Sequence, residues 1–240
     1  MIKMIGFDGD DTLWHSEGYY QAASAAFADI VGRYVDLGDR GVHDDMLATE
    51  RRNLALFGYG AKGMTLSMVE TAIAVTDGRI SAKDIHRLVE IGKGVLRHPV
   101  ELLPGIRAAV EAVGREFPLV LITKGDLFHQ EQKVEQSGLS DLFRRIEIVS
   151  EKHERTYRRL FEEFAIAPDQ FLMVGNSLRS DIEPVVRLGG WGVHVPYHVT
   201  WSHELDHGLE PGHAHVATVE APEHIPQAVA ALAGTAAAGA

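Results

Sequence analysis

The chain has 240 residues, of which 34 are acidic and 23 basic, so its formal net charge is −11. This length allows one large domain or a core with a smaller second domain, and a hydrophobic content of 45% is normal for a globular protein. The acidic balance argues against nucleic acid or an anionic membrane as the main partner. The absence of cysteine excludes disulfides and thiolate chemistry.

Targeting and membrane-spanning segments are not expected. No run of about 18 apolar residues is present, as a transmembrane helix would require. The N-terminus reads directly as a core strand, without the charged and apolar regions of a signal peptide. We therefore expect a soluble, cytoplasmic protein.

The first predicted strand, residues 4–7, ends in two aspartates separated by one glycine. Asp8 and Asp10 follow the strand, and Gly9 allows a tight turn between them. Ligands of open α/β sheets bind outside the carboxyl ends of the strands, where these side chains would lie. Two carboxylates this close stay ionised only beside a cation; otherwise the pKa of one rises. The pattern is compatible with a Mg²⁺ site, with a nucleophile beside a general acid, or with an ordinary acidic turn.

A helical insertion is predicted between the first and second strands. Apolar residues recur at helical spacing through this interval, and Ser81 with Asp84 is typical of a capping box. Pro99 and Pro104 mark the return of the chain. We predict a cap domain over residues 15–99, rooted where it could act as a lid, and a core domain formed by residues 1–14 and 100–240.

The core domain is predicted to be α/β, with a Rossmann-like, doubly wound parallel sheet. Short apolar segments alternate with helical ones from about residue 105 onward. The further strands are predicted at residues 119–123, 146–149, 171–174, 191–195 and, more weakly, 215–219, and the helices at 107–115, 127–137, 155–164 and 178–188.

Polar residues suited to phosphate or metal binding follow the next three strands as well. Thr123 and Lys124 end the second strand, Lys152 follows the third, and Asn176 and Asp181 follow the fourth. A hydroxyl with free backbone N–H groups can bind a phosphoryl oxygen, and a lysine can neutralise nearby carboxylates. Each segment alone has a simpler explanation, such as a strand end, a solvated lysine or a carboxylate at a helix N-terminus.

Together these four segments resemble the motifs of the haloacid dehalogenase-like (HAD) hydrolase superfamily. The matching segments are residues 8–12, Thr123, Lys152, and residues 175–177 with Asp181. The resemblance covers nearly the whole chain, because the helical insertion falls where the first type of cap lies in that family. It implies an HAD-like core with a helical cap domain, and a Mg²⁺-dependent hydrolase.

The resemblance also implies roles for the motif residues. Asp8 would be the nucleophile that forms an aspartyl-phosphate, and Asp10 would protonate the leaving alcohol and then activate water. Thr123 and Lys152 would bind the phosphoryl group, with Lys152 also orienting Asp8, and Lys124 would add positive charge near the bound phosphate. Mg²⁺ would be bound by Asp8, the backbone carbonyl of Asp10, Asp181 and Asn176. Asn176 stands where many relatives carry Asp, which predicts weaker metal binding, and Lys124 stands where many carry Asn.

Two other features receive ordinary structural interpretations. Six histidines cluster near the C-terminus, at positions 194, 198, 203, 207, 213 and 215, but the segment lacks cysteine and the HExxH pattern. We expect a solvated or substrate-side loop there, not a zinc site. Trp14 lies close to the predicted site, and packing within the lid is its default explanation.

The sequence thus predicts a Mg²⁺-dependent phosphatase, a phosphoric monoester hydrolase that acts on a small phosphorylated metabolite. A phosphomutase would use the same residues and differ in how the cap excludes water. A 2-haloacid dehalogenase needs the nucleophile but neither the metal nor an acid at position 10. A non-catalytic binding module on the same fold is a further alternative, although such a module has no need of the costly charges at Asp8, Asp10, Lys152 and Asp181. The expected partner is a small phosphate ester, and the chain is expected to be a monomer or a homodimer.

Overall fold

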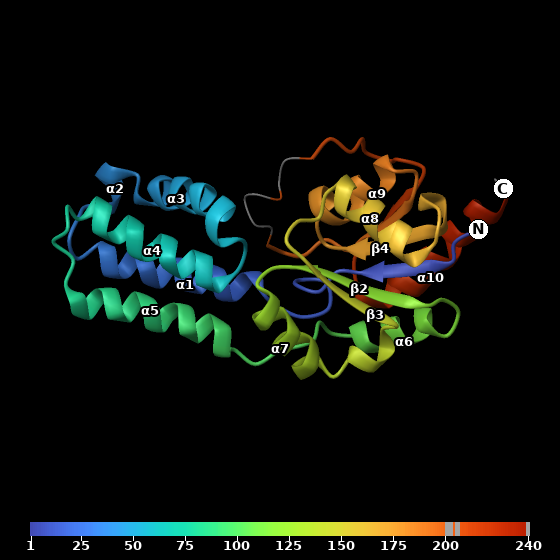
Figure 1. Cartoon of the computed structure of the whole chain (residues 1–240), viewed down its shortest axis with the longest axis horizontal. Helices are drawn as coiled ribbons and strands as arrows, with labels where there is room; N and C mark the ends of the chain where they lie inside the picture. The colour runs from blue at the N-terminus through green and yellow to red at the C-terminus, as the bar shows by residue number, and fades with distance from the viewer. Residues whose placement is uncertain (200–203, 205–206, 239–240) are drawn as a thin grey trace. The chain divides into compact units, whose positions relative to one another are not determined.

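The computed structural model describes residues 1–199, 204 and 207–238 (Figure 1). The chain divides into two compact units, one formed by Met1–Glu17 with Val100–Ala240 and the other by Gly18–Pro99. The inserted unit begins at Gly18, whereas the cap was predicted to begin at residue 15. The chain enters the inserted unit after Glu17 and leaves it after Pro99.

The first unit is built on a six-stranded, entirely parallel sheet with the strand order β3-β2-β1-β4-β5-β6. The predicted α/β sheet is confirmed, and each predicted strand is present within about one residue. The strands are β1 (Met4–Phe7), β2 (Leu119–Lys124), β3 (Arg145–Val149), β4 (Phe171–Gly175), β5 (Trp191–His194) and β6 (Val216–Thr218).

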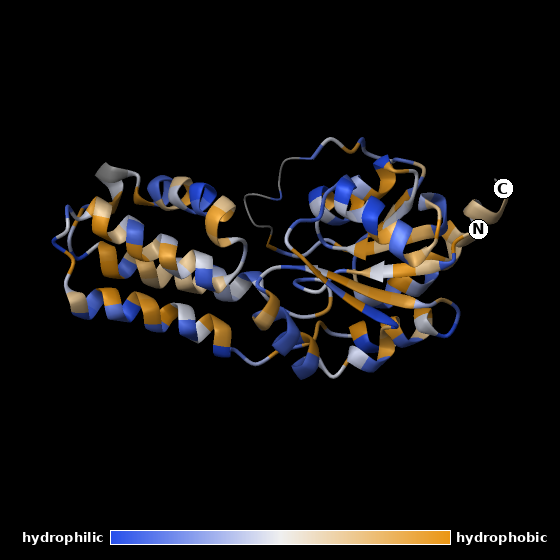
Figure 2. Ribbon diagram, in the orientation of Figure 1, coloured by the Kyte–Doolittle hydropathy of each residue, from blue (hydrophilic) through white to orange (hydrophobic). Residues whose placement is uncertain are grey.

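Helices cover both faces of this sheet, which explains why its central strands are continuous apolar runs. In β2, Leu119 and Leu121 pack on one face, and Val120 and Ile122 on the other. The first face packs against α6 (Ile106–Gly114), α7 (Leu127–Ser137) and α10 (Ile225–Ala238), and the second against α8 (Glu154–Phe164) and α9 (Glu183–Arg187). Figure 2 shows hydrophobic colours along much of the sheet. The core therefore consists of two apolar layers, and the carboxyl ends of the strands lie at one edge between them.

The inserted unit is helical, as predicted. Its helices are α1 (Glu17–Val31), α2 (Leu37–Arg40), α3 (Val42–Phe57), α4 (Ala61–Val75) and α5 (Ala82–Arg97). They bury an apolar cluster of their own that includes Phe27, Met68 and Leu88. Ser81 caps α5 by accepting a hydrogen bond from the backbone N–H of Asp84, whose carboxylate accepts from the hydroxyls of Ser81 and Tyr34. None of the described helices is long and apolar enough to span a bilayer.

One predicted element differs from the structure. Residues 178–188 were expected to form a single α-helix, but Leu178–Ile182 form a π-helical turn and only Glu183–Arg187 are α-helical. The carbonyl of Ser177 accepts hydrogen bonds from the backbone N–H groups of both Asp181 and Ile182, so the first turn is wider than an α-turn. Within the histidine-rich segment, His203 lies outside the described residues.

Candidate active site

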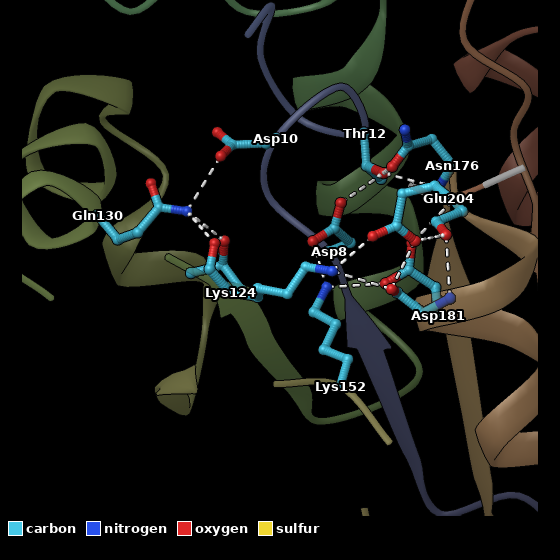
Figure 3. A network of polar contacts seen from close by, with 12 residues as sticks. Asp8, Asp10, Thr12, Lys124, Gln130, Lys152, Asn176, Asp181 and Glu204 are labelled. Atoms are coloured by element: carbon cyan, nitrogen blue, oxygen red, sulfur yellow. Dashed lines mark hydrogen bonds and ion pairs between the residues drawn. The ribbon is translucent and has the colours of Figure 1, made fainter. Parts of the chain in front are cut away.

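The predicted motif residues meet at the carboxyl edge of the sheet. Asp8 directly follows β1, Thr123 lies at the end of β2, Lys152 follows β3 and Asn176 follows β4. These four strands are neighbours in the order β3-β2-β1-β4, so the ends of sequence-distant segments lie side by side (Figure 3). The structure thus brings all seven residues chosen from the sequence to this edge, with Lys124 at the margin of two adjoining clusters.

The first cluster is a buried triad of charged groups. The ammonium of Lys152 contacts Oδ1 of Asp8 and lies 2.7 Å from Oδ1 of Asp181. The side chains of Lys152 and Asp181 are at most 2% exposed, and that of Asp8 is 8% exposed. One cation therefore serves two carboxylates in an environment that largely excludes water.

The charge balance of this triad controls the pKa of Asp8. Burial and the neighbouring carboxylate of Asp181 raise the pKa of Asp8 to about 7, although Lys152 acts in the opposite direction. The two carboxylates raise the pKa of Lys152 despite its burial, so the lysine stays protonated. The triad has an excess of negative charge, and a second cation beside Asp8 would stabilise its ionised form.

The donor atoms around Asp8 suit a magnesium ion. The inward-facing end of the Asn176 amide lies 3.2 Å from the main-chain oxygen of Asp10, from Oδ2 of Asp8 and from Oγ1 of Thr12. With its nitrogen inward, the amide donates to these oxygens; with its oxygen inward, it adds one more hard ligand to a set of oxygens that already converge. In the described part of the chain no three His, Cys, Asp or Glu side chains form a metal site, so carbonyl and amide oxygens would be needed here.

Local backbone geometry explains why Asp181 reaches the site. The π-helical turn brings its carboxylate back over the end of β4, where Oδ2 accepts a hydrogen bond from the backbone N–H of Ser177 at 3.0 Å. Gly175 makes room for it, because a Cβ there would lie 2.3 Å from Oδ2 of Asp181. A side chain at position 175 would therefore displace the carboxylate.

The second cluster surrounds Asp10. The indole Nε1 of Trp14 donates to Oδ1 at 2.6 Å, and Nε2 of Gln130 donates to Oδ2 at 3.1 Å. The ammonium of Lys133 lies 2.7 Å from Oδ1 and 2.9 Å from Oδ2. Burial disfavours ionisation of Asp10, but the charge of Lys133 and these hydrogen bonds outweigh it and lower its pKa. Trp14 packs in the apolar core of this unit, so its expected place in the cap was wrong.

Thr123 lies against the second cluster and the turn that contains Gly9. Its side chain is fully buried at the end of β2, and its hydroxyl accepts a hydrogen bond of 2.8 Å from Nε2 of Gln130. Gly9 allows this close packing, because a Cβ there would lie 3.0 Å from Oγ1 of Thr123 and 2.8 Å from the ring of Trp14. The turn between Asp8 and Asp10 therefore lies directly against the threonine hydroxyl.

Lys124 points toward a carboxylate that the sequence did not suggest. Its ammonium lies 2.5 Å from Oε1 of Glu204 and 3.1 Å from Oγ of Ser180, and the Glu204 carboxylate also accepts from the hydroxyls of Ser177 and Ser180. Burial of Glu204 opposes ionisation, but Lys124 and these hydroxyls lower its pKa to about 2. Lys124 is therefore neutralised by the chain itself, at the margin of the site (Figure 3).

Three residues of this arrangement were missed by sequence analysis. Gln130 and Lys133 lie on α7, where polar residues are normally assigned to a solvated face, yet they are only 2% and 9% exposed. Their spacing of three residues, which places them on one face of the helix, is the only signal they offered. Glu204 lies in the histidine-rich segment, and nothing in its sequence context indicates a contact with Lys124.

Comparison with known proteins agrees with this geometry. A family model described as haloacid dehalogenase-like hydrolase matches residues 2–189. The chain is similar to the crystal structure of a haloacid dehalogenase-like family hydrolase from Xanthomonas campestris, with 54% identity over 98% of each chain and a TM-score of 0.90. A search of curated proteins found no match.

More distant solved structures share the fold. A predicted phosphoglycolate phosphatase from Haemophilus somnus is 17% identical over 94% of this chain and 97% of its own, with a TM-score of 0.61. A 2-haloacid dehalogenase from Pseudomonas syringae pv. Tomato is 19% identical over 96% and 99%, also with a TM-score of 0.61. Overall similarity thus includes both phosphatases and dehalogenases, and the choice between these activities depends on the site.

Proposed function

Because this chain belongs to the haloacid dehalogenase-like hydrolases and is therefore an enzyme, we propose that it is a Mg²⁺-dependent phosphatase. Its substrate is a small phosphorylated metabolite, and the reaction proceeds through an aspartyl-phosphate on Asp8. This proposal is more specific than the family, which includes dehalogenases and phosphomutases.

The observation that carries the proposal is the second carboxylate, Asp10. Displacement of a halide by Asp8 needs no proton donor, because the halide leaves as a stable anion. Release of an alcohol from a phosphate ester needs a proton on the leaving oxygen, and hydrolysis of the intermediate needs a base. Asp10 lies two residues from Asp8 in a separate cluster with its own hydrogen-bond donors, as an acid–base group distinct from the nucleophile requires.

The chemistry divides into two steps. In the first, an oxygen of Asp8 attacks phosphorus, the bond from phosphorus to the leaving oxygen breaks, and Asp10 gives its proton to that oxygen. In the second, Asp10 takes a proton from water, the water oxygen attacks phosphorus, and the bond between phosphorus and Asp8 breaks. Inorganic phosphate and the original enzyme result, so each atom and proton is balanced over the cycle.

The remaining residues provide positioning and charge. Lys152 holds Asp8 and offsets repulsion between the carboxylate and the phosphate dianion, and the hydroxyl of Thr123 donates to a phosphoryl oxygen. Asp8, Asp181, Asn176 and the carbonyl of Asp10 would hold Mg²⁺. When bound, this ion supplies positive charge for the phosphoryl oxygens and lowers the pKa of Asp8.

The test is hydrolysis of p-nitrophenyl phosphate by wild type and Asp8→Asn, each with Mg²⁺ and with EDTA. We expect release of p-nitrophenol only by wild type with Mg²⁺. Matched assays with L-2-chloropropionate should release no chloride. Chloride release without phosphate hydrolysis, or equal background in all phosphatase assays, would contradict the proposal.

A further inference from the structure

Lys133 is a buried cation that has no role in the two reaction steps proposed above. It lies on α7, outside the four motif segments, and is only 9% exposed. Its ammonium contacts both carboxylate oxygens of Asp10, at 2.7 Å and 2.9 Å. A lysine at a solvated helix surface would extend into water, so this contact has a desolvation cost that an ordinary surface pair does not have.

Two further donors complete the surroundings of the carboxylate. Trp14 is 1% exposed and donates to one oxygen of Asp10, and Gln130 is 2% exposed and donates to the other. Gln130 is itself fixed, because its Nε2 also lies 2.8 Å from Oγ1 of Thr123 and 2.9 Å from the carbonyl of Lys124. The donors of Asp10 are thus tied to β2 and to the packed core.

This arrangement restricts the direction of the Asp10 side chain. In Figure 3 its carboxylate is turned toward Gln130, away from Asp8. In an in-line displacement the leaving oxygen departs on the side of phosphorus opposite the nucleophile, so the acid must not point at Asp8. Because Lys133 contacts both oxygens, one oxygen can turn to the leaving group while the other remains bound to the ammonium.

We propose that Lys133 is a positioning residue for the acid–base group Asp10. The inference rests on the proposed phosphatase function and assigns a role in it to a residue outside the motifs. Lys133 does not contact the reacting atoms in this account. It fixes the direction of the Asp10 carboxyl on the side away from Asp8, and Gln130 couples that position to the phosphate-binding hydroxyl of Thr123.

The experiment compares two nearly isosteric esters, p-nitrophenyl phosphate and phenyl phosphate, with wild type, Lys133→Met and Lys133→Arg. The p-nitrophenolate ion leaves without a proton, whereas phenolate is a poorer leaving group and depends more on the acid. We measure kcat/KM, which includes the step that breaks the ester bond. Lys133→Met should lower kcat/KM for phenyl phosphate about tenfold more than for p-nitrophenyl phosphate. This factor is smaller than the effect of general-acid catalysis as a whole, because Asp10 itself remains present. Lys133→Arg keeps a donor to Asp10 and should restore much of the difference.

The ratio of the two kcat/KM values in one preparation is independent of the folded fraction, so it remains informative if Lys133→Met is destabilised. Lys3→Met is the matched control, because Lys3 is exposed and precedes β1 at the end opposite Asp8; its ratio should equal that of wild type. If wild type hydrolyses both esters and Lys133→Met keeps the wild-type ratio, the inference is wrong and the proposed function stands. If wild type hydrolyses neither ester, the proposed function is wrong, and this inference with it.

Discussion

Asp8 and Asp10 are carboxylates of the same turn, yet their surroundings shift their pKa values in opposite directions. Asp8 shares one lysine with a second carboxylate, and its pKa is raised to about 7. Asp10 has a lysine of its own and two further donors, and its pKa is lowered. Although only two positions apart in sequence, Asp8 shares its cation with a second carboxylate, whereas Asp10 has a cation of its own.

The contrast arises because the partners come from different elements. Lys152 and Asp181 follow β3 and β4, whereas Lys133 and Gln130 lie on α7. In the metal-free protein these surroundings favour the protonated form of Asp8 and the ionised form of Asp10. Mg²⁺ bound beside Asp8 would lower its pKa and favour the ionised nucleophile. The donors at Asp10 favour its ionised form, which is the form that takes a proton from water in the second step.

The largest effect is expected from removing the shared lysine. Lys152→Met leaves Asp8 and Asp181 buried together without their cation, which we expect to cost about 3–5 kcal/mol of stability. Loss of phosphate binding and of the orientation of Asp8 should also reduce kcat/KM for p-nitrophenyl phosphate by about 10³-fold or more. Urea unfolding and steady-state kinetics measure these effects, with Lys3→Met as the control. A variant with wild-type kinetics would remove Lys152 from the mechanism.

A smaller effect should follow from neutralising Asp8. Its folded-state pKa is raised from 3.8 to about 7, so the folded protein binds this proton more tightly than the unfolded chain does. The stability of the metal-free wild type should therefore fall as pH rises from about 4 to 7, and Asp8→Asn should lack the part of this loss that comes from Asp8. In EDTA, the Tm of Asp8→Asn should exceed that of wild type at pH 8 by more than at pH 5.

The control for this pH series is Asp141→Asn, because Asp141 is exposed and lies far from Asp8 in sequence. It should follow wild type throughout the range. A constant difference between Asp8→Asn and wild type at all pH values would mean that the charge of Asp8 does not destabilise the fold. The inference that the triad of Asp8, Asp181 and Lys152 has an excess of negative charge would then be wrong.

The smallest effect is expected at the margin of the site. Glu204→Gln weakens the contact with Lys124, which we expect to cost about 1 kcal/mol at pH 7. Because the folded-state pKa of Glu204 is lowered from 4.5 to about 2, the difference from wild type should be complete above pH 4.5 and shrink as pH falls below it. Urea unfolding at pH 7 and pH 3.5 measures this, and a difference that grows at low pH would contradict the assignment.

Sequence could identify the first of the two compared clusters better than the second. Asp8 and Lys152 stand just after strand ends, and parallel strands necessarily bring those ends to one edge. Asp181 lies farther along, in the turn that follows β4. Lys133 and Gln130 lie inside a helix, where a lysine and a glutamine look like solvent-facing residues. Whether they face the site depends on how α7 packs, which the local sequence does not determine. The π-helical turn at Leu178–Ile182 was missed for a related reason, since it differs from an α-helix by a hydrogen-bonding pattern and not by composition.

The central claim is that the two carboxylates have different roles, Asp8 as nucleophile and Asp10 as acid and base. Rapid-quench measurement of p-nitrophenol release by Asp10→Asn with Mg²⁺ tests it most directly. Because p-nitrophenolate needs no proton, the variant should still phosphorylate Asp8 but hydrolyse the intermediate slowly without its base. We therefore predict a burst stoichiometric with enzyme, followed by slow turnover, with the phosphoryl group found on the peptide that contains Asp8. Linear release without a burst, or a phosphoryl group on another residue, would contradict the account.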